Sequence, residues 1–235
     1  DRTRLTWLRE IHGAAGWPES VPAEALAAIT SRSRTGGDPR LALKLLRTAA
    51  VRCWWNNAPD ETRAAVVAAA GRMSVPRDDP ALLTVRAHAD PVRQGAEVIA
   101  RISRMTPNPA DPARMHLTGS AAAAVWAYDL AVPFLDTAVH GLRAQGRLGL
   151  LAQARVTQAW ALVHLAREPL AVAAAEEAWR LAQETGQPRF AAAARFAQAT
   201  IAAERGDFDT AESRVSEAEG LLLSRGTTPM LALAQ

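Results

Sequence analysis

The C-terminal half of the chain repeats itself at an interval of 40 residues. Glycines recur at Gly146, Gly186 and Gly226, and residues 154–159 (ARVTQA) realign with residues 194–199 (ARFAQA). Two series of alanines keep the same interval: Ala131, Ala171 and Ala211, and Ala138, Ala178 and Ala218. A period of about 20 to 50 residues is typical of repeat proteins, in which each structural unit packs against the next. The repeat therefore predicts a stack of similar units.

The composition indicates that these units are helical. Alanine is the commonest residue and only 5% of the residues are aromatic, which favours helices over strands. Asp-Pro pairs mark helix starts, because the aspartate can cap the helix and the proline suits its first turn. These pairs lie at Asp38-Pro39, Asp79-Pro80, Asp90-Pro91 and Asp111-Pro112. Glycines mark helix ends at positions 36, 146, 186, 206 and 226. We expect an all-α fold with helices at residues 4–15, 22–34, 39–56, 59–72, 80–89, 91–105, 112–127, 129–145, 147–166, 169–185, 188–205 and 207–225.

The short connections between these helices predict antiparallel hairpins, because a short loop leaves successive helices side by side. We therefore expect an α-solenoid of antiparallel helical hairpins with tetratricopeptide-like repeats of about 40 residues. Residues 1–105 are expected to form irregular hairpins and residues 112–235 regular repeats, the last of them incomplete. The Pro- and Asp-rich residues 106–112 are the expected loop between them, within one continuous superhelix.

One segment, residues 205–212 (RGDFDTAE), is similar to a tetratricopeptide repeat. In this segment Gly206 is expected to end one helix and Asp207 to cap the next. Phe208 is expected to begin the core face of that second helix. The interval of 40 residues is longer than the usual tetratricopeptide period of about 34 residues.

Several classes of function lack the residues that they need. No run of residues approaches the roughly 20 apolar residues of a membrane span, and no glycine-rich loop ends in Gly-Lys-Ser or Gly-Lys-Thr for binding a nucleotide. The histidines never fall three or four residues apart, so we expect no metal site and no cofactor. Acidic and basic residues alternate around a net charge of +3, which does not favour nucleic-acid binding. The single cysteine, Cys53, excludes an internal disulfide and indicates a reducing compartment, the cytoplasm.

Four polar residues are the main candidates for a binding site. Arg155 and Gln158 lie three residues apart, so they share one helix face, and Arg195 and Gln198 repeat them 40 residues later. Both pairs fall on the first helix of a hairpin, and the first helices line the concave surface of such arrays. An arginine and glutamine ladder there suits a carboxylate, a phosphate or a peptide backbone. The alternative is that these side chains bond between neighbouring helices or face water.

Other candidates are aromatic or titratable. Trp126 and Trp160 could line a groove for an apolar ligand or peptide, although tryptophans also fill the gaps that alanine-rich helices leave. Asp136 and His140 lie one helical turn apart and could act as an acid–base pair. The alternative for this second pair is a solvated surface contact, which we favour.

Three segments resemble a stretch of large actinobacterial LuxR-type transcriptional regulators. They are residues 141–154 (GLRAQGRLGLLAQA), residues 174–188 (AAEEAWRLAQETGQP) and residues 89–98 (ADPVRQGAEV). Those regulators carry an N-terminal ATP-binding module, a tetratricopeptide-like middle region and a C-terminal helix-turn-helix. The resemblance implies that this chain is the middle region alone, with ATP hydrolysis and DNA binding in other parts of the parent protein.

The hypothesis that follows is a non-catalytic sensor and interaction region of a transcriptional regulator. It binds a partner protein or a small inducer on its concave face, without direct nucleic-acid or membrane contact. A stand-alone scaffold that binds peptides is the first alternative. An enzyme built on helical hairpins, with Asp136 and His140 as its acid–base pair, is the second.

Overall fold

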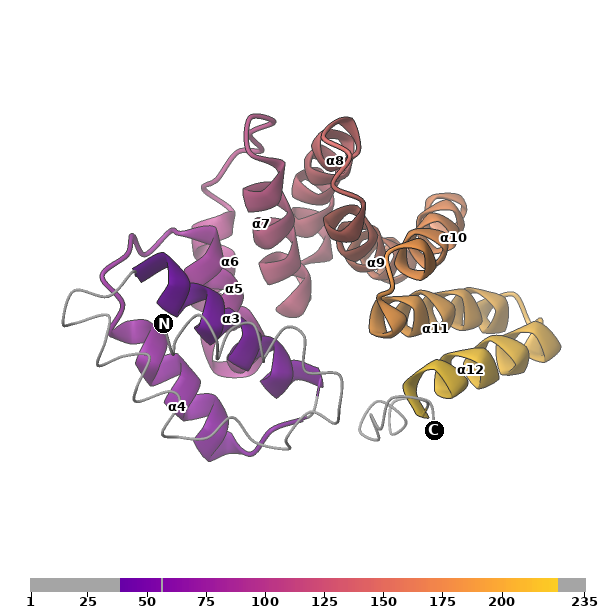
Figure 1. Cartoon of the computed structure of the whole chain (residues 1–235), viewed down its shortest axis with the longest axis horizontal. Helices are drawn as coiled ribbons and strands as arrows, with labels where there is room; N and C mark the ends of the chain where they lie inside the picture. Colours follow the sequence, from indigo (N-terminus) through magenta and orange to yellow (C-terminus); the bar gives the residue numbers. More distant parts are fainter. Residues whose placement is uncertain (1–38, 56, 224–235) are drawn as a thin grey trace.

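The computed structural model describes residues 39–55 and 57–223, and within these ranges the chain is entirely helical (Figure 1). The helices are α3 (Pro39–Trp55), α4 (Asp60–Gly71), α5 (Pro80–Ala89), α6 (Pro91–Ile102), α7 (Pro112–Ala124), α8 (Tyr128–Ala144), α9 (Leu148–His164), α10 (Glu168–Glu184), α11 (Pro188–Glu204) and α12 (Phe208–Leu223). The predicted all-α class is confirmed, and each helix predicted from residue 39 onward corresponds to one of these. The helices predicted at 4–15 and 22–34, with Gly36 and Gly226, lie outside the described residues.

Aspartate caps begin several of the helices, as the Asp-Pro pairs predict. Each aspartate side chain accepts a backbone N–H of the first helical turn, which otherwise has no partner within the helix. The bonds run from Ala81 to Asp79 at 2.9 Å, from Arg93 to Asp90 at 3.1 Å and from Arg114 to Asp111 at 3.1 Å. Asp207 caps α12 in the same way by accepting the N–H of Thr210 at 3.1 Å.

Five successive turns between helices have the same backbone geometry. Each contains one residue in the left-handed region, and these residues follow one another every 20 positions: Trp126 (φ 62°), Gly146 (63°), Ala166 (53°), Gly186 (65°) and Gly206 (77°). In every turn this residue donates its N–H to the carbonyl three positions back, and the next residue donates to the carbonyl five positions back. This is the Schellman pattern of helix ends. The structural unit is therefore one helix with its turn, and the 40-residue repeat contains two of them.

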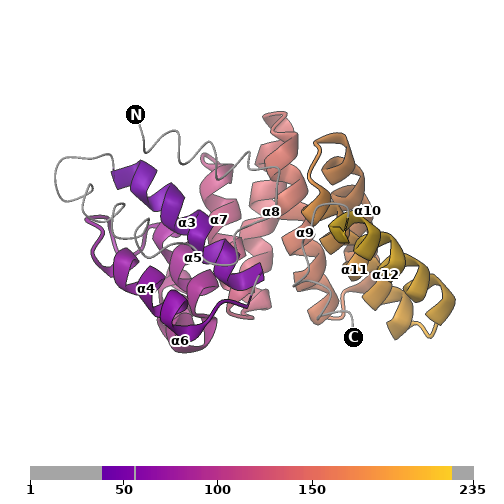
Figure 2. The same ribbon diagram turned by 60° about the horizontal axis from the view of Figure 1, so that its bottom comes forward.

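The helices pack in chain order. The closest pairs are α7 with α8, α9 with α10 and α11 with α12, and each second helix also contacts the first helix of the next pair. The odd-numbered helices from α3 to α11 contact one another in succession as well. Figures 1 and 2 show α7 to α12 following a curve, with the C-terminal end of α3 directed towards its inner side. The odd-numbered helices thus form a layer of their own.

Buried alanines form much of the core. Ala131, Ala138, Ala171 and Ala178 have no exposed surface, which allows neighbouring helices to approach closely. A Cβ atom added at Gly119 of α7 would lie 2.6 Å from Cγ of Leu135 in α8. One hydrophobic cluster extends from α5 to α11. The segment between α6 and α7 therefore interrupts the helices without dividing the core.

Two predicted details are wrong. Phe208 begins α12 but its side chain is 71% exposed, so it does not start a core face. Helical side chains lean towards the N-terminus of their helix, and the first residue has no helical turn beneath it to cover. Trp126, predicted inside a helix, lies two residues beyond the end of α7 in the left-handed turn.

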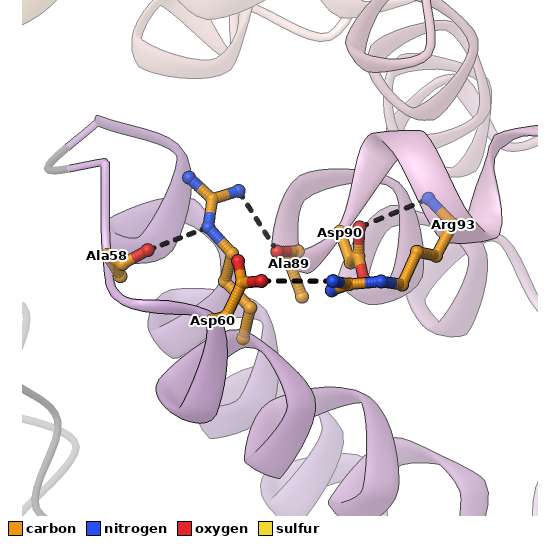
Figure 3. Close-up of polar contacts among 6 residues, drawn as sticks. Ala58, Asp60, Ala89, Asp90 and Arg93 are labelled. Carbon is orange, nitrogen blue, oxygen red and sulfur yellow. Dashed lines mark hydrogen bonds and ion pairs between the residues drawn. The ribbon is translucent and has the colours of Figure 1, made fainter.

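Arginine contacts join α4 to the turn between α5 and α6 (Figure 3). Arg63 donates to the carbonyl of Ala58 at 2.8 Å and to that of Ala89 at 3.4 Å. Arg93 bridges Asp60 and Asp90, at 2.9 Å and 3.2 Å. None of the helices in the described part of the chain is long and apolar enough to cross a membrane.

We expect opposite effects from exchanging glycine and alanine at equivalent turns. Gly186→Ala should lower the free energy of unfolding by about 1 kcal/mol, because the left-handed conformation is unfavourable for a residue with a Cβ atom. Ala166→Gly should raise the same free energy by up to about 1 kcal/mol for the same reason. No atom lies within 4 Å of a Cβ added at Gly186, so sterics contribute little there. Urea denaturation followed by circular dichroism measures both.

The matched control is Gly220→Ala, on a helical backbone in α12 where an added Cβ also has nothing within 4 Å. This change should raise the free energy of unfolding by about 0.5–1 kcal/mol, because alanine favours a helix. Equal effects at Gly186 and Gly220 would contradict the assignment of left-handed strain to the turns.

Candidate functional site

The four ladder residues lie on α9 and α11, and each arginine bonds to its own glutamine. Arg155 donates from Nη1 to Oε1 of Gln158 at 2.6 Å. Arg195 donates in the same way to Gln198 at 2.7 Å. The predicted pairing on one helix face is therefore present in both repeats, on the first helix of a closely packed pair.

Each arginine also pairs with an acidic residue on the second helix of its hairpin. Arg155 of α9 donates from Nε to Oε2 of Glu177 in α10 at 2.5 Å. Glu177 also accepts from Arg143 of α8 at 2.6 Å, and Gln158 donates to Asp136 of α8 at 2.5 Å. This set of five side chains, the α9 network, joins three consecutive helices with two positive and two negative charges.

The equivalent contacts in the next repeat are more buried. Arg195 of α11 places its Nε atom 2.8 Å from Oε2 of Glu217 in α12, although this nitrogen makes no aligned hydrogen bond. Its guanidinium carbon lies 3.9 Å from the ring centroid of Trp179 in α10, the geometry of a cation–π contact. Arg214 lies 2.7 Å from the other oxygen of Glu217.

The acidic partners are residues that the sequence reasoning missed. Glu177 and Glu217 lie 40 residues apart, each directly before an alanine of the repeat. The signal was therefore present in the register. Local helix spacing did not reveal it, because the contact runs between two helices and not along one.

The electrostatics of the ladder suit a structural contact. Burial by itself would raise the pKa of Glu177, but the hydrogen bonds from Arg143 and Arg155 hold that pKa below its usual value. Burial lowers the pKa of Arg195, and Arg214 lowers it further. The Arg155 and Arg195 side chains are 19% and 9% exposed. A ligand at the ladder would therefore compete with Glu177 and Glu217, and the binding role of these residues stays a prediction.

The two candidate tryptophans have different surroundings. Trp126 is 74% exposed at the turn between α7 and α8. Trp160 is half-buried in α9 and donates its Nε1–H to the carbonyl of Ala193 in α11 at 3.2 Å. Its ring lies 6.1 Å from that of His164, which stacks on Tyr128 at 4.5 Å. Among the described residues no ring contact joins Trp126 to Trp160.

The predicted acid–base pair is not formed in the structure. Asp136 and His140 both lie on the exposed side of α8, and Asp136 accepts its bond from Gln158. The described part of the chain has no hydrogen bond between Asp136 and His140. Within residues 39–55 and 57–223, no group of three histidine, cysteine or acidic side chains is placed to hold a metal ion.

Aromatic side chains gather where the odd-numbered helices face each other. Trp55, at the end of α3, packs against two small clusters built largely from alanines of α11 and their neighbours in α9, α10 and α12. Phe190 and Phe196 of α11, with Trp160 of α9, pack against the same clusters and are half-buried. We call this set, Trp55, Trp160, Phe190 and Phe196, the inner aromatic surface.

Two histidines are buried among basic groups on α3, α5 and α7. Burial lowers the pKa of His88 to about 4, opposed by its hydrogen bond to the Thr84 carbonyl and assisted by Arg47. Burial also lowers the pKa of His116 to about 4, and Arg47, His88 and Arg147 add to the effect. Both imidazoles are therefore neutral at pH 7. The Nδ1 atom of His116 has no hydrogen-bond partner.

No protein-family model matches the chain, and no match is found among curated proteins or among solved structures.

Two arginines that share one acidic partner provide a test of the ladder. Arg155→Ala should lower the free energy of unfolding by about 1–3 kcal/mol, because hydrogen bonds to charged groups of low exposure are lost and Glu177 loses one partner. Arg143→Ala should lower it by less than about 1 kcal/mol, because the Arg143 side chain is 49% exposed. Guanidinium denaturation measures both. An equal loss for the two variants would show that burial does not set the contribution.

The buried histidines predict a loss of stability in mild acid. In the unfolded chain a histidine titrates near 6.5, whereas His88 and His116 titrate near 4 when folded. The unfolded state therefore binds more protons between these values, so stability falls as the pH drops from 6.5 to 4 and is complete above 6.5. Each histidine should contribute on the order of 2–3 kcal/mol to this fall.

Urea midpoints measured between pH 7 and pH 4.5 test the assignment. The fall should shrink in His88→Gln and in His116→Gln, since glutamine does not titrate. His140→Gln is the control, because His140 is exposed. A fall that is unchanged in both buried-site variants would assign the acid sensitivity to the carboxylates.

Proposed function

We propose that the chain is a tetratricopeptide-like α-solenoid. The support is the repetition of one helix and one left-handed turn every 20 residues, together with the separate layer of odd-numbered helices. In such an array the first helices of the hairpins line the concave side. The odd-numbered helices would then present one continuous inner surface.

The proposed function is that of a non-catalytic interaction region of a transcriptional regulator, which binds a partner protein or a small inducer on this inner surface. The resemblance of residues 141–154, 174–188 and 89–98 to LuxR-type regulators supports the regulatory setting. ATP hydrolysis and DNA binding would belong to other parts of such a protein. We therefore assign neither activity to this chain.

The observation that carries the proposal is the inner aromatic surface. Phe190, Phe196 and Trp160 lie against clusters of small alanines, which leave part of each ring uncovered. Large half-exposed aromatic side chains on a rigid support contribute strongly to protein interfaces. The Arg155 and Arg195 ladder would support this surface by holding α9 and α11 to their neighbours.

Display selection of peptides on the immobilised chain provides the test, with two phenylalanines of one hairpin as a matched pair. Phe196 belongs to the inner aromatic surface, whereas Phe208 is 71% exposed at the turn before α12. Binders should lose affinity by about tenfold or more in Phe196→Ala, because a central aromatic contact is worth 1.4 kcal/mol or more. They should retain it in Phe208→Ala.

Melting curves establish that both variants are folded before affinities are compared. Binders that depend on Phe208 and not on Phe196 would move the binding surface to the outer turns. Selection that yields no binder of the folded chain would refute an interaction role for the inner surface.

A further inference from the structure

The end of α3 covers part of the inner aromatic surface. Trp55 packs against the alanine clusters of α9 to α12, although α3 and α11 are separated by seven intervening helices of the chain. Figures 1 and 2 both show the C-terminal end of α3 directed towards α9 and α11. Contacts in a repeat array run mainly between neighbours, so this long-range contact is distinct from the packing of the array itself.

The apolar part of this contact is favourable. Trp55 is half-buried against alanines and lies on the same cluster as Phe196. Burying part of a tryptophan ring removes a large apolar area from water. The inner surface therefore accepts an aromatic side chain presented from a helix end.

The charged part of the contact is unfavourable. Arg52, one helical turn before Trp55, is buried, and it lies close enough to Arg189 of α11 to affect its titration. Burial lowers the pKa of Arg189 to about 10, and the positive charge of Arg52 lowers it further. Two like charges therefore meet where the aromatic contact is made, and each disfavours the other.

A different occupant could keep the favourable part and reverse the other. A carboxylate in the place of Arg52 would face the Arg189 guanidinium, and partly buried arginines bind carboxylates with charge-assisted hydrogen bonds. The spacing is set by α3 itself: Arg52 and Trp55 lie three residues apart, on one face of a helix.

We propose that the end of α3 is a displaceable occupant of the inner surface, and that the partner protein replaces it with a helical segment carrying a carboxylate and an aromatic side chain three residues apart. This inference rests on the proposed function, because it takes the inner surface as the binding surface. It adds the chemistry of the partner and the element that the partner displaces.

The test uses two peptides with the sequence of α3, residues 39–55, both with Cys53→Ser to prevent oxidation. One keeps arginine at position 52, and the other carries Arg52→Glu. Their affinities for the whole chain with Trp55→Ala, which frees the surface, are measured by fluorescence anisotropy. The peptide with glutamate should bind at least about tenfold more tightly. This preference should disappear when the protein also carries Arg189→Gln.

Equal affinities of the two peptides would overturn the proposal, and so would a preference that persists in Arg189→Gln. Displacement of the bound peptide by inorganic phosphate at equal ionic strength, to the same extent as by unlabelled peptide, would identify a plain anion site and would also overturn it. If display-selected binders depend on Phe196 but neither peptide binds, the proposed function stands and the displacement by an α3-like segment fails.

A second measurement does not depend on the folding of the Trp55→Ala variant. In the otherwise unchanged chain, Arg52→Glu should raise the melting temperature, because a like-charge contact with Arg189 becomes an attractive one. The rise should be lost in the Arg189→Gln background. A melting temperature that falls by the same amount in both backgrounds would contradict the charge argument.

Discussion

The close approach of alanine-lined helices is the constraint on which the rest of the structure depends. Ala138 and Ala178 are fully buried on the second helices of their hairpins, where a larger side chain would push the helices apart. Because the helices lie so close, one arginine on α9 reaches a carboxylate on α10, and the adjacent glutamine reaches α8. The polar ladder is therefore a consequence of the alanine packing and could not form between widely spaced helices.

The turns add a second constraint, which decides where each helix face points. Four consecutive helices, α8 to α11, are each 17 residues long, and each is followed by the same left-handed turn. Identical lengths and turns bring each odd-numbered helix back beside the previous one, which places Arg155 and Arg195 on equivalent faces. A turn of different length would rotate the next helix and separate the two halves of the ladder.

The features that could be predicted from the sequence are the local ones. Helix starts at Asp90 and Asp111 and helix ends at Gly146 and Gly186 depend on the chemistry of a few adjacent residues, so they are visible without tertiary contacts. The 20-residue unit was hidden because Ala166 and Trp126 occupy positions where glycine is expected. There, the surrounding helices impose a backbone that the residue itself does not favour.

The features that could not be predicted depend on contacts far apart in the sequence. Glu177 follows from the register only once the pairing of α9 with α10 is known, and Trp55 reaches α11 only through the accumulated curvature of the helices between them. No periodicity in the sequence encodes that curvature.

The two sets of arginines on the odd-numbered helices differ in what surrounds their charges. Arg155 faces Glu177, so its charge is balanced within the array and stabilises it. Arg189 faces Arg52, which is held there by the packing of α3 and increases the local positive charge. A fold gains nothing from such a like-charge contact, whereas an acidic partner gains from it. The inner aromatic surface therefore combines an apolar contact that any aromatic residue can make with an electrostatic preference that the present occupant does not satisfy.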